Sequence, residues 1–314
     1  MNTPILVPLD GSTFAEQALP TAIDLAARTG RRLQLVRVHV PRSSPTDVPG
    51  DARWDALVHE EGEDYLRGIA DRCQREAGLV VRTELLDGTI ATALATYVQE
   101  RGIGLVVMTT HGHGGISRAW VGSVADALVR RVRVPVLLLR PCDRCSPLLV
   151  APRAHHVLIP VDGSELSARI LEPAFQLGGL WGAHFTLLHV LPPERPGSRA
   201  VDGPDDPRSF AELVLDELAA PLRARGATID IAVVEGSVPA NTILDFAASN
   251  AVDAIAIATR GRGGWERVAI GSVADKVMRG SMLPMLLFRP PSLVPQEGDV
   301  LPVAPAPTLL QRAG

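Results

Sequence analysis

Short apolar runs alternate with longer amphipathic stretches along the first half of the chain. The apolar runs are rich in leucine and β-branched residues and fall at residues 5–10, 33–40, 80–88, 105–110 and 134–140. Between them, stretches with one apolar face cover residues 12–29, 54–77, 89–101 and 123–131. Near-continuous apolar runs are typical of strands buried on both faces, and amphipathic stretches are typical of helices. The alternation predicts a parallel sheet with helices on both faces.

The second half repeats this pattern in the same order. The repeated segments are ILVPLDGS (5–12) and VLIPVDGS (157–164), LVRVHV (35–40) and TLLHV (186–190), and VPVLLLRP (134–141) and LPMLLFRP (283–290). A glycine-rich loop also occurs twice and ends both times in Gly-Ser-Val-Ala-Asp. The copies lie about 150 residues apart, a spacing that suits a duplicated domain and is too long for a solenoid unit.

The repeats predict two tandem α/β domains, at residues 1–142 and 153–291. We expect each domain to be doubly wound, with a five-stranded parallel sheet in the order 3-2-1-4-5 and helices on both faces. The last strand of each domain is apolar and lies at a sheet edge that needs covering. Residues 292–314 are rich in proline and follow neither the helical nor the strand period, so we expect a flexible C-terminal tail.

Composition and charge narrow the function classes. The chain has 314 residues, of which 46% are hydrophobic and 21% are charged, enough for two buried cores. The net charge is -4 and no basic block occurs, which excludes nucleic-acid binding by phosphate neutralisation. No apolar run approaches the roughly 18 residues of a membrane span and no signal region is evident, so we expect a cytoplasmic protein without membrane contact. Lys276 is the only lysine and has no Gly-Lys-Ser context, which excludes a P-loop.

Candidate chemistry follows the first and fourth strands of each half. Ligands of doubly wound sheets bind beyond the carboxyl ends of the strands, where the strand order reverses. Asp10 and Asp162 follow the first strands, and the glycine loops after the fourth strands lead into helices that begin near Ser123 and Ser272. Glycines allow close backbone approach and a helix start presents unpaired N–H groups, so each loop is suited to holding phosphate.

A purely structural interpretation is open at the same positions. Asp-Gly-Ser after a strand is also a turn with a helix cap. The spacing from Ser123 to Asp126, and from Ser272 to Asp275, is close to that of a capping box. An acidic residue in the first helical turn would also weaken phosphate binding there.

In combination, these residues resemble the universal stress protein superfamily in its tandem, ATP-binding form. The resemblance covers both halves nearly from end to end. The signature of that superfamily is Gly-x2-Gly-x9-Gly-Ser/Thr. The matching residues are Gly112, Gly122 and Ser123 in the first half and Gly261, Gly271 and Ser272 in the second.

The resemblance implies roles for the residues around the two loops. Thr109 and Ala258 stand where the signature has its first glycine, so side chains approach the ribose there. His111 corresponds to Arg260, whose permanent charge is expected to hold a triphosphate more firmly. The remaining implied contacts are Asp10 and Asp162 with ribose or adenine, the backbone of Val40 and Val190 with the adenine edge, and Gly112, Gly122, Ser123, Gly261, Gly271 and Ser272 with phosphates.

The resemblance also implies a function and a mode of assembly. It implies an ATP-binding, regulatory protein of the stress response that acts through nucleotide-dependent interaction with a protein partner. The halves are expected to pack as a pseudo-twofold dimer within one chain, and a homodimer is a further expectation. Two alternatives stay open: a slow ATPase or nucleotide-transferring enzyme that uses Asp10 or Asp162 with Mg²⁺, and a nucleotide-free scaffold whose pocket is spoiled by Thr109 and Ala258.

No catalytic residue and no metal site is assigned from the sequence. Cys142-x2-Cys145, with His155 and His156 nearby, has a spacing that permits zinc. A single Cys-x2-Cys is a weak signal, and a linker with two free thiols is the interpretation that we favour.

Overall fold

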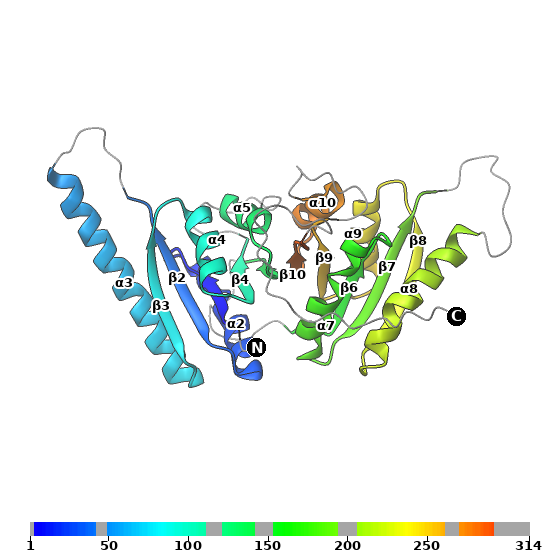
Figure 1. Ribbon diagram of the computed structural model, residues 1–314, viewed down its shortest axis with the longest axis horizontal. Coiled ribbons are helices and arrows are strands. Elements are labelled where there is room, and N and C mark those ends of the chain that lie inside the picture. The colour runs from blue at the N-terminus through cyan, green and yellow to red at the C-terminus, as the bar shows by residue number, and fades with distance from the viewer. Residues whose placement is uncertain are drawn as a thin grey trace, which may run out of the picture.

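The computed structural model describes residues 3–41, 49–110, 121–141, 153–193, 206–260 and 270–291, with the backbone alone at 49–53. Their strands form one ten-stranded sheet in the order β3-β2-β1-β4-β5-β10-β9-β6-β7-β8. Each half contributes five strands whose pairs are all parallel. The predicted order 3-2-1-4-5 is therefore confirmed in both halves, which lie side by side in Figure 1.

The elements follow one another in the predicted alternation. The first half comprises β1 (Ile5–Pro8), α1 (Thr13–Glu16), α2 (Leu19–Thr29), β2 (Leu33–His39), α3 (Pro49–Ala77), β3 (Val81–Asp87), α4 (Ile90–Glu100), β4 (Leu105–Thr109), α5 (Ser123–Arg131) and β5 (Val136–Leu139). The second half comprises β6 (His156–Pro160), α6 (Glu165–Ala168), α7 (Leu171–Gly179), β7 (His184–Leu191), α8 (Pro207–Arg223), β8 (Thr228–Glu235), α9 (Pro239–Ser249), β9 (Ala254–Ala258), α10 (Ser272–Gly280) and β10 (Met285–Phe288).

The single helix predicted over residues 12–29 is two helices in the structure. The α1 helix ends at Glu16 and α2 begins at Leu19, with Pro20 in its first turn. Proline has no N–H to donate and its ring excludes the carbonyl four residues earlier, so it is tolerated at a helix start and breaks a helix interior. The amphipathic period continues across this break, so periodicity alone did not reveal it.

Two hydrophobic cores lie on opposite faces of the sheet. Alternate residues of each strand enter different cores: Ile5 and Val7 enter one and Leu6 enters the other. Helices α2, α3, α7 and α8 cover the first face, and α4, α5, α9 and α10 cover the second. Burial on both faces explains why these strands are apolar at nearly every position.

The two halves join where β5 and β10 pair antiparallel, and we call this pairing the seam. Its register pairs Val136, Leu137 and Leu138 with Leu287, Leu286 and Met285. On one face of the sheet α2 contacts the segment directly after α7, because the Trp181 indole N–H donates to Asp24 Oδ2 at 2.7 Å. On the other face α5 lies beside α10 (Figure 1). The pseudo-twofold packing of the halves is thus observed within one chain.

Four charged side chains join α5 to α10 in a symmetric network. Arg130 donates to Asp126 on its own helix at 2.8 Å and to Asp275 on the other helix at 3.3 Å. Arg279 donates to Asp275 at 3.0 Å and to Asp126 at 3.2 Å. Each carboxylate therefore has one arginine from each half, so the network closes across the seam.

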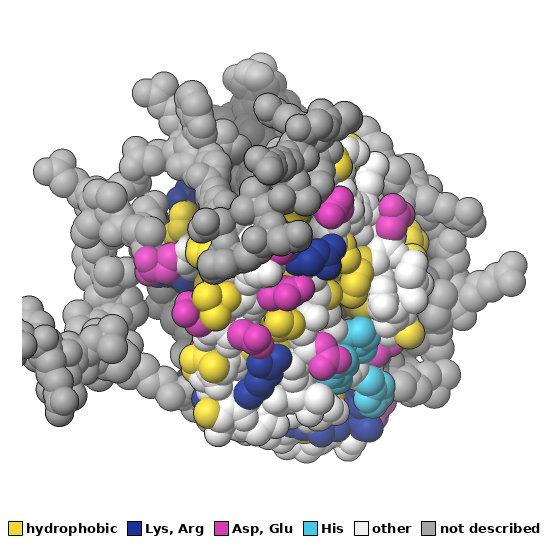
Figure 2. Space-filling view, turned by 90° about the vertical axis from the view of Figure 1, so that its right-hand side faces the viewer, with side chains coloured by type: hydrophobic (Ala, Val, Ile, Leu, Met, Phe, Trp, Pro, Cys, Tyr) yellow, Lys and Arg dark blue, Asp and Glu magenta, His cyan; other side chains and the backbone are white. Residues whose placement is uncertain are grey.

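The outer surface of the second half is mixed in character. Phe210 and Leu213 on α8 are 58% and 57% exposed. Figure 2 shows that hydrophobic side chains on this face are interspersed with carboxylates and arginines, while histidine side chains gather in one place. Among the described residues, no helix combines the length and hydrophobicity needed to cross a membrane.

The seam should stabilise the whole sheet as one cooperative unit. Leu286 is 4% exposed and lies in the middle of the seam. We expect Leu286→Ala to lower the free energy of unfolding by about 2–5 kcal/mol, because it leaves a cavity beneath a paired strand. Urea denaturation measures the change, and Leu213→Ala, at an exposed leucine, is the control with an expected change within about 0.5 kcal/mol. Equal effects of the two variants would show that the seam is not buried in solution.

The four-residue network predicts a dependence of stability on pH. Hydrogen bonds from Arg130, with the charges of Arg130 and Arg279, hold the pKa of Asp126 below its usual range. A carboxyl whose pKa is lowered by folding stabilises the protein above its unfolded pKa of about 3.9, and this contribution is lost as pH falls through the lower folded value. We expect Asp126→Asn to cost up to about 1 kcal/mol at pH 7 and progressively less toward pH 2. Denaturation at several pH values checks this, and a difference that stays constant down to pH 2 would contradict it.

Candidate functional site

The predicted site residues converge at the carboxyl edge of each half. Because β1 pairs with β4, Asp10 after β1 lies near Thr109 at the end of β4. In the second half β6 pairs with β9, which brings Asp162 near Ala258. This is the position where the strand order reverses, which is where doubly wound sheets bind their ligands.

The Asp-Gly-Ser segments form tight turns in both halves. Asp162 Oδ1 accepts hydrogen bonds from the Ser164 N–H at 3.0 Å and from the Ser164 hydroxyl at 2.6 Å. Gly163 has a φ of 78°, which a residue with a Cβ adopts only with strain. Ser164 in turn caps α6 by accepting from the Ser167 N–H at 3.1 Å. The turn-and-cap interpretation is therefore confirmed, and this turn also fixes the direction of the carboxylate.

The same turn occurs after β1. Asp10 Oδ1 accepts from the Ser12 N–H at 2.9 Å and from the Ser12 hydroxyl at 2.6 Å, and Gly11 has a φ of 87°. Ser12 caps α1 through the Ala15 N–H. Repetition of this geometry shows that the two halves place their aspartates in equivalent positions.

The starts of α5 and α10 differ from the expected capping box. Gly122 and Gly271 are the N-cap residues, and no side-chain hydrogen bond caps either helix. Asp126 and Asp275 instead each pair with one arginine on their own helix and one across the seam, and these arginines neutralise their charge. The first-turn N–H groups therefore lack a side-chain partner among the described residues, and a helix start in this state attracts anions.

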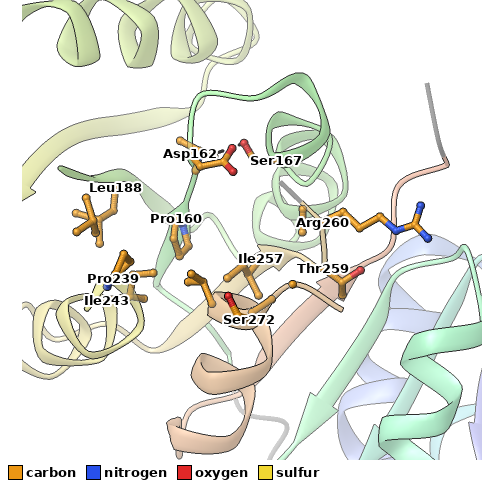
Figure 3. Close-up of a pocket in the computed structure, with 16 residues that line it drawn as sticks. Pro160, Asp162, Ser167, Leu188, Pro239, Ile243, Ile257, Thr259, Arg260 and Ser272 are labelled. Atoms are coloured by element: carbon orange, nitrogen blue, oxygen red, sulfur yellow. Dashed lines mark hydrogen bonds between the residues drawn. The ribbon is translucent and has the colours of Figure 1, made fainter. Parts of the chain in front are cut away.

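A cavity of about 420 Å³ opens at the carboxyl edge of the second half (Figure 3). Figure 3 shows Leu188, Pro239 and Ile243 together at one end of the cavity, while the polar residues Asp162, Thr259 and Ser272 lie around the rest of it. The lining residues are Pro160, Val161, Asp162, Ser167, Leu188, Val190, Pro239, Ile243, Ile257, Ala258, Thr259, Arg260, Gly271, Ser272, Val273 and Ala274. Five predicted positions besides Asp162 are among them: Val190, Ala258, Arg260, Gly271 and Ser272.

Thr259 is a lining residue that sequence reasoning missed. It is fully buried, and its hydroxyl has no hydrogen-bond partner among the described residues. A buried polar atom without a partner is costly in a folded protein unless a ligand or water satisfies it. Threonine also occupies the equivalent position in the first half, Thr110, and this repetition was the available signal. Ser167 was missed as well, since the first half has Ala15 in its place.

The strand register corrects one predicted equivalence. Similarity of His39-Val40 to His189-Val190 suggested that these two valines correspond. In the structure, the Leu9 N–H donates to Val36 O and the Val161 N–H donates to Leu188 O, so Val38 occupies the place of Val190. Val40 lies two residues further on and is 55% exposed. The misalignment spans two residues and therefore preserved the strand face, which is why the alternation of side chains did not expose it.

The other predicted positions fall into three groups. Thr109 and Ala258 are both buried at the ends of their strands, and Thr109 has the larger side chain. The guanidinium of Arg260 extends away from Asp162 and from the apolar end of the cavity in Figure 3. The last group lies outside the described residues and comprises His111, Gly112, Gly261, Cys142 and Cys145.

Histidines occur near the site, and none of the described ones belongs to a metal-holding group. His189 Nδ1 lies 2.8 Å from Val161 O, a contact that ties the end of β7 to the segment before Asp162. His39 Nε2 lies 3.5 Å from Asp55 Oδ1, at the same sheet edge in the first half. In the described part of the chain no set of three or more His, Cys, Asp or Glu side chains could hold a metal ion.

Comparison with known protein families shows which family the chain belongs to. The model of the universal stress protein family matches residues 1–140 and 154–289, so both halves match the same family. The chain therefore belongs to the universal stress protein family, in its tandem two-domain form. Two universal stress proteins of Mycobacterium tuberculosis strain H37Rv match over nearly their whole length. Rv2005c is 26% identical over 299 residues, and Rv2623 is 27% identical over 303 residues; each match covers 91% of this chain and 96% of the relative.

Solved structures show the same fold. A universal stress protein from Archaeoglobus fulgidus DSM 4304 superposes with a TM-score of 0.70 at 19% identity, covering 92% of this chain and 99% of that one. A putative universal stress protein from Pseudomonas aeruginosa UCBPP-PA14 superposes with a TM-score of 0.60 at 20% identity, covering 91% and 93% of the two chains. The tandem arrangement of the halves is thus shared with solved members of the family.

The unpartnered hydroxyl of Thr259 can be tested by stability. Thr259→Val keeps the shape of the side chain and removes a hydroxyl that has no described partner, so the free energy of unfolding should change by less than about 0.5 kcal/mol. Ser164→Ala removes a helix cap and should cost about 1 kcal/mol. Chemical denaturation of both variants without ligand makes the comparison. A loss of 1 kcal/mol or more in Thr259→Val would mean that the hydroxyl is hydrogen-bonded in the unliganded protein.

Proposed function

We propose that this protein binds ATP at the cavity of the second half, and that the equivalent edge of the first half forms a second, narrower nucleotide site. One observation carries the proposal: an uncapped helix start, a fixed carboxylate and an apolar crevice meet at the carboxyl ends of β6 and β9. The helix start suits the phosphates, the carboxylate suits the ribose, and the apolar crevice suits the base.

The dimensions and chemistry of the cavity support this assignment. Its volume of about 420 Å³ lies within the roughly 300–1,000 Å³ of small-molecule sites. Leu188, Val190 and Ile243 offer apolar surface to an adenine ring. With the ring bound there, the backbone of Val190 would face the edge of the adenine. Asp162 accepts hydrogen bonds, as a ribose hydroxyl requires. Gly271 and Ser272, at the start of α10, present backbone N–H groups to the phosphates.

The first half carries corresponding residues, with two differences. Asp10, Gly122 and Ser123 have the same backbone setting as their counterparts. Thr109 replaces Ala258, so its extra atoms reduce the room for ribose. His111 replaces Arg260, and a neutral imidazole attracts a triphosphate less strongly than a guanidinium does. We infer that the second site binds ATP more tightly than the first.

Family membership supports a role in the stress response. We infer that the protein acts in the stress response as a regulator in the cytoplasm, with nucleotide occupancy governing its interaction with a protein partner. Residues 1–142 and 153–291 would each act as one nucleotide-binding unit, with ATP bound as its Mg²⁺ complex. Hydrolysis of the bound ATP is not part of this proposal, because efficient phosphoryl transfer needs positioned cations and a metal-holding carboxylate.

Release of bound nucleotide from the purified protein tests the binding proposal. Gly271→Val places a side chain at the N-cap of α10, a position that lines the cavity, and among the described residues an added Cβ there meets only Thr259 O, at 3.4 Å. We expect denatured parent protein to release adenine nucleotide, and calorimetry with ATP and Mg²⁺ to show at least a tenfold loss of affinity at the second site in this variant, about 1.4 kcal/mol. Gly179→Val is the matched control, because an added Cβ there meets nothing within 4 Å.

The same experiment separates the competing functions. Nucleotide retained equally by parent, Gly179→Val and Gly271→Val would remove the second site from the proposal. Absence of nucleotide from the parent, with none bound on adding ATP and Mg²⁺, would favour the nucleotide-free scaffold. ADP or another product accumulating in proportion to protein would favour the enzyme.

A further inference from the structure

Each of the two central helices is held at its far end by an arginine of the opposite half. Arg140 follows β5 and donates to Ser281 O at 3.0 Å and to Met278 O at 2.6 Å, at the carboxyl end of α10. Arg289 follows β10 and donates to Arg130 O, in the last turn of α5. The last carbonyls of a helix lack helical partners, so these side chains satisfy groups that would otherwise be unpaired.

The same arginines are joined to the start of the helix in their own half. Leu139, directly before Arg140, accepts from the Thr110 N–H at 2.9 Å, and Thr110 O accepts from the Gly122 N–H at 2.6 Å. Two backbone hydrogen bonds therefore connect the strand end that carries Arg140 to the N-cap of α5. Nothing but backbone atoms is needed for this connection, so it is as rigid as the sheet edge that it extends.

The second half repeats the connection. Phe288, directly before Arg289, accepts from the Thr259 N–H at 2.8 Å, and Thr259 O accepts from the Gly271 N–H at 2.7 Å. Because β5 and β10 run in opposite directions, the far end of each helix lies at the carboxyl edge of the other half. Each helix thus begins at its own site and ends on the arginine tied to the other site.

The two helices are also joined along their length, by aspartates in their first turns and arginines in their last turns. Asp126, Arg130, Asp275 and Arg279 form the closed network between α5 and α10 described above. A shift of either helix along its axis would break these ion pairs together with the arginine contacts at its end. The two helix starts are consequently positioned by one shared set of interactions.

We propose that the two nucleotide sites are energetically coupled through these contacts, so that ATP at one site raises the affinity of the other. The inference rests on the proposed function, because it assigns a regulation to the same sites. Phosphates held at one helix start fix that helix, and its far end then fixes the arginine, the strand end and the N-cap glycine of the other site. The second nucleotide meets a site that is already ordered, which gives positive cooperativity.

The test uses the full chain, with ATP and Mg²⁺ as the probe. Coupling is measured as a ratio of binding constants. Gly122→Val and Gly271→Val each leave one site, and calorimetry gives the affinity of that site while the other is empty. In the parent, the product of the two stepwise association constants should exceed the product of the two single-site constants by about fivefold or more. Independent sites would give a ratio within about twofold of one and would overturn the inference.

A second comparison assigns the coupling to the proposed contacts. Arg140→Gln, introduced into the parent and into both single-site variants, should return the ratio to about one while changing each single-site affinity by less than about twofold. Arg289→Gln should act in the same way through the other helix. Arg223→Gln is the matched control, because Arg223 also donates to a backbone carbonyl, Ile229 O, away from the seam. Coupling that survives both Arg140→Gln and Arg289→Gln would show that these arginine contacts do not carry it.

Hydrogen exchange gives a site-resolved measurement that does not depend on the ratio. In Gly122→Val, ATP occupies only the second site, and amide exchange in residues 123–131 should still slow on its addition. Arg289→Gln should abolish this slowing, because it releases the far end of α5. Exchange unchanged by ATP in Gly122→Val would contradict the coupling, whereas absence of ATP binding in every protein would reject the proposed function itself.

Discussion

The antiparallel pairing of β5 with β10 is the contact on which the rest of the molecule depends. Each half alone would end in a short apolar strand with unpaired N–H and C=O groups, an edge that folded proteins must cover. Pairing the two edges satisfies these groups and buries leucines from both sides. It also sets the two carboxyl edges in opposite directions, since all strands within one half run the same way. The crevices therefore open on opposite sides of a continuous sheet, and α5 and α10 are brought together between them.

The chemistry at each crevice comes mainly from backbone groups that the fold leaves without side-chain partners. Glycine at the N-cap supplies no side chain to cap the helix, and the acidic residue that could weaken an anion site is directed to an arginine instead. Asp10 and Asp162 are fixed by the serine two residues later, which also caps the next helix. The turn and the cap hold each aspartate in one direction, so evidence for a turn at these positions does not argue against the proposed site.

Much of this architecture could be predicted from the sequence because it follows from local periodicity and repetition. Apolar runs, amphipathic stretches and the duplicated order predicted two parallel sheets and the residues at their carboxyl edges. The break before Leu19 was missed because Pro20 interrupts a helix without interrupting its apolar period. The correspondence of Val40 to Val190 failed because a shift of two residues leaves a strand pattern unchanged. The contacts of Arg140 and Arg289 and the ion pairs across the seam could not be predicted, since those partners lie in the opposite half and follow no sequence spacing.

Fusion of the halves into one chain has a consequence for how the seam responds to dilution. Two separate chains that pair through a strand of this length would dissociate as their concentration falls. A covalent connection instead holds the edges at an effective concentration in the millimolar range, whatever the amount of protein in solution. The joined sheet is then independent of expression level, and the two copies are free to diverge, because a substitution such as alanine for threonine at the end of β9 changes one crevice only. A symmetric assembly of identical chains would carry every such change twice.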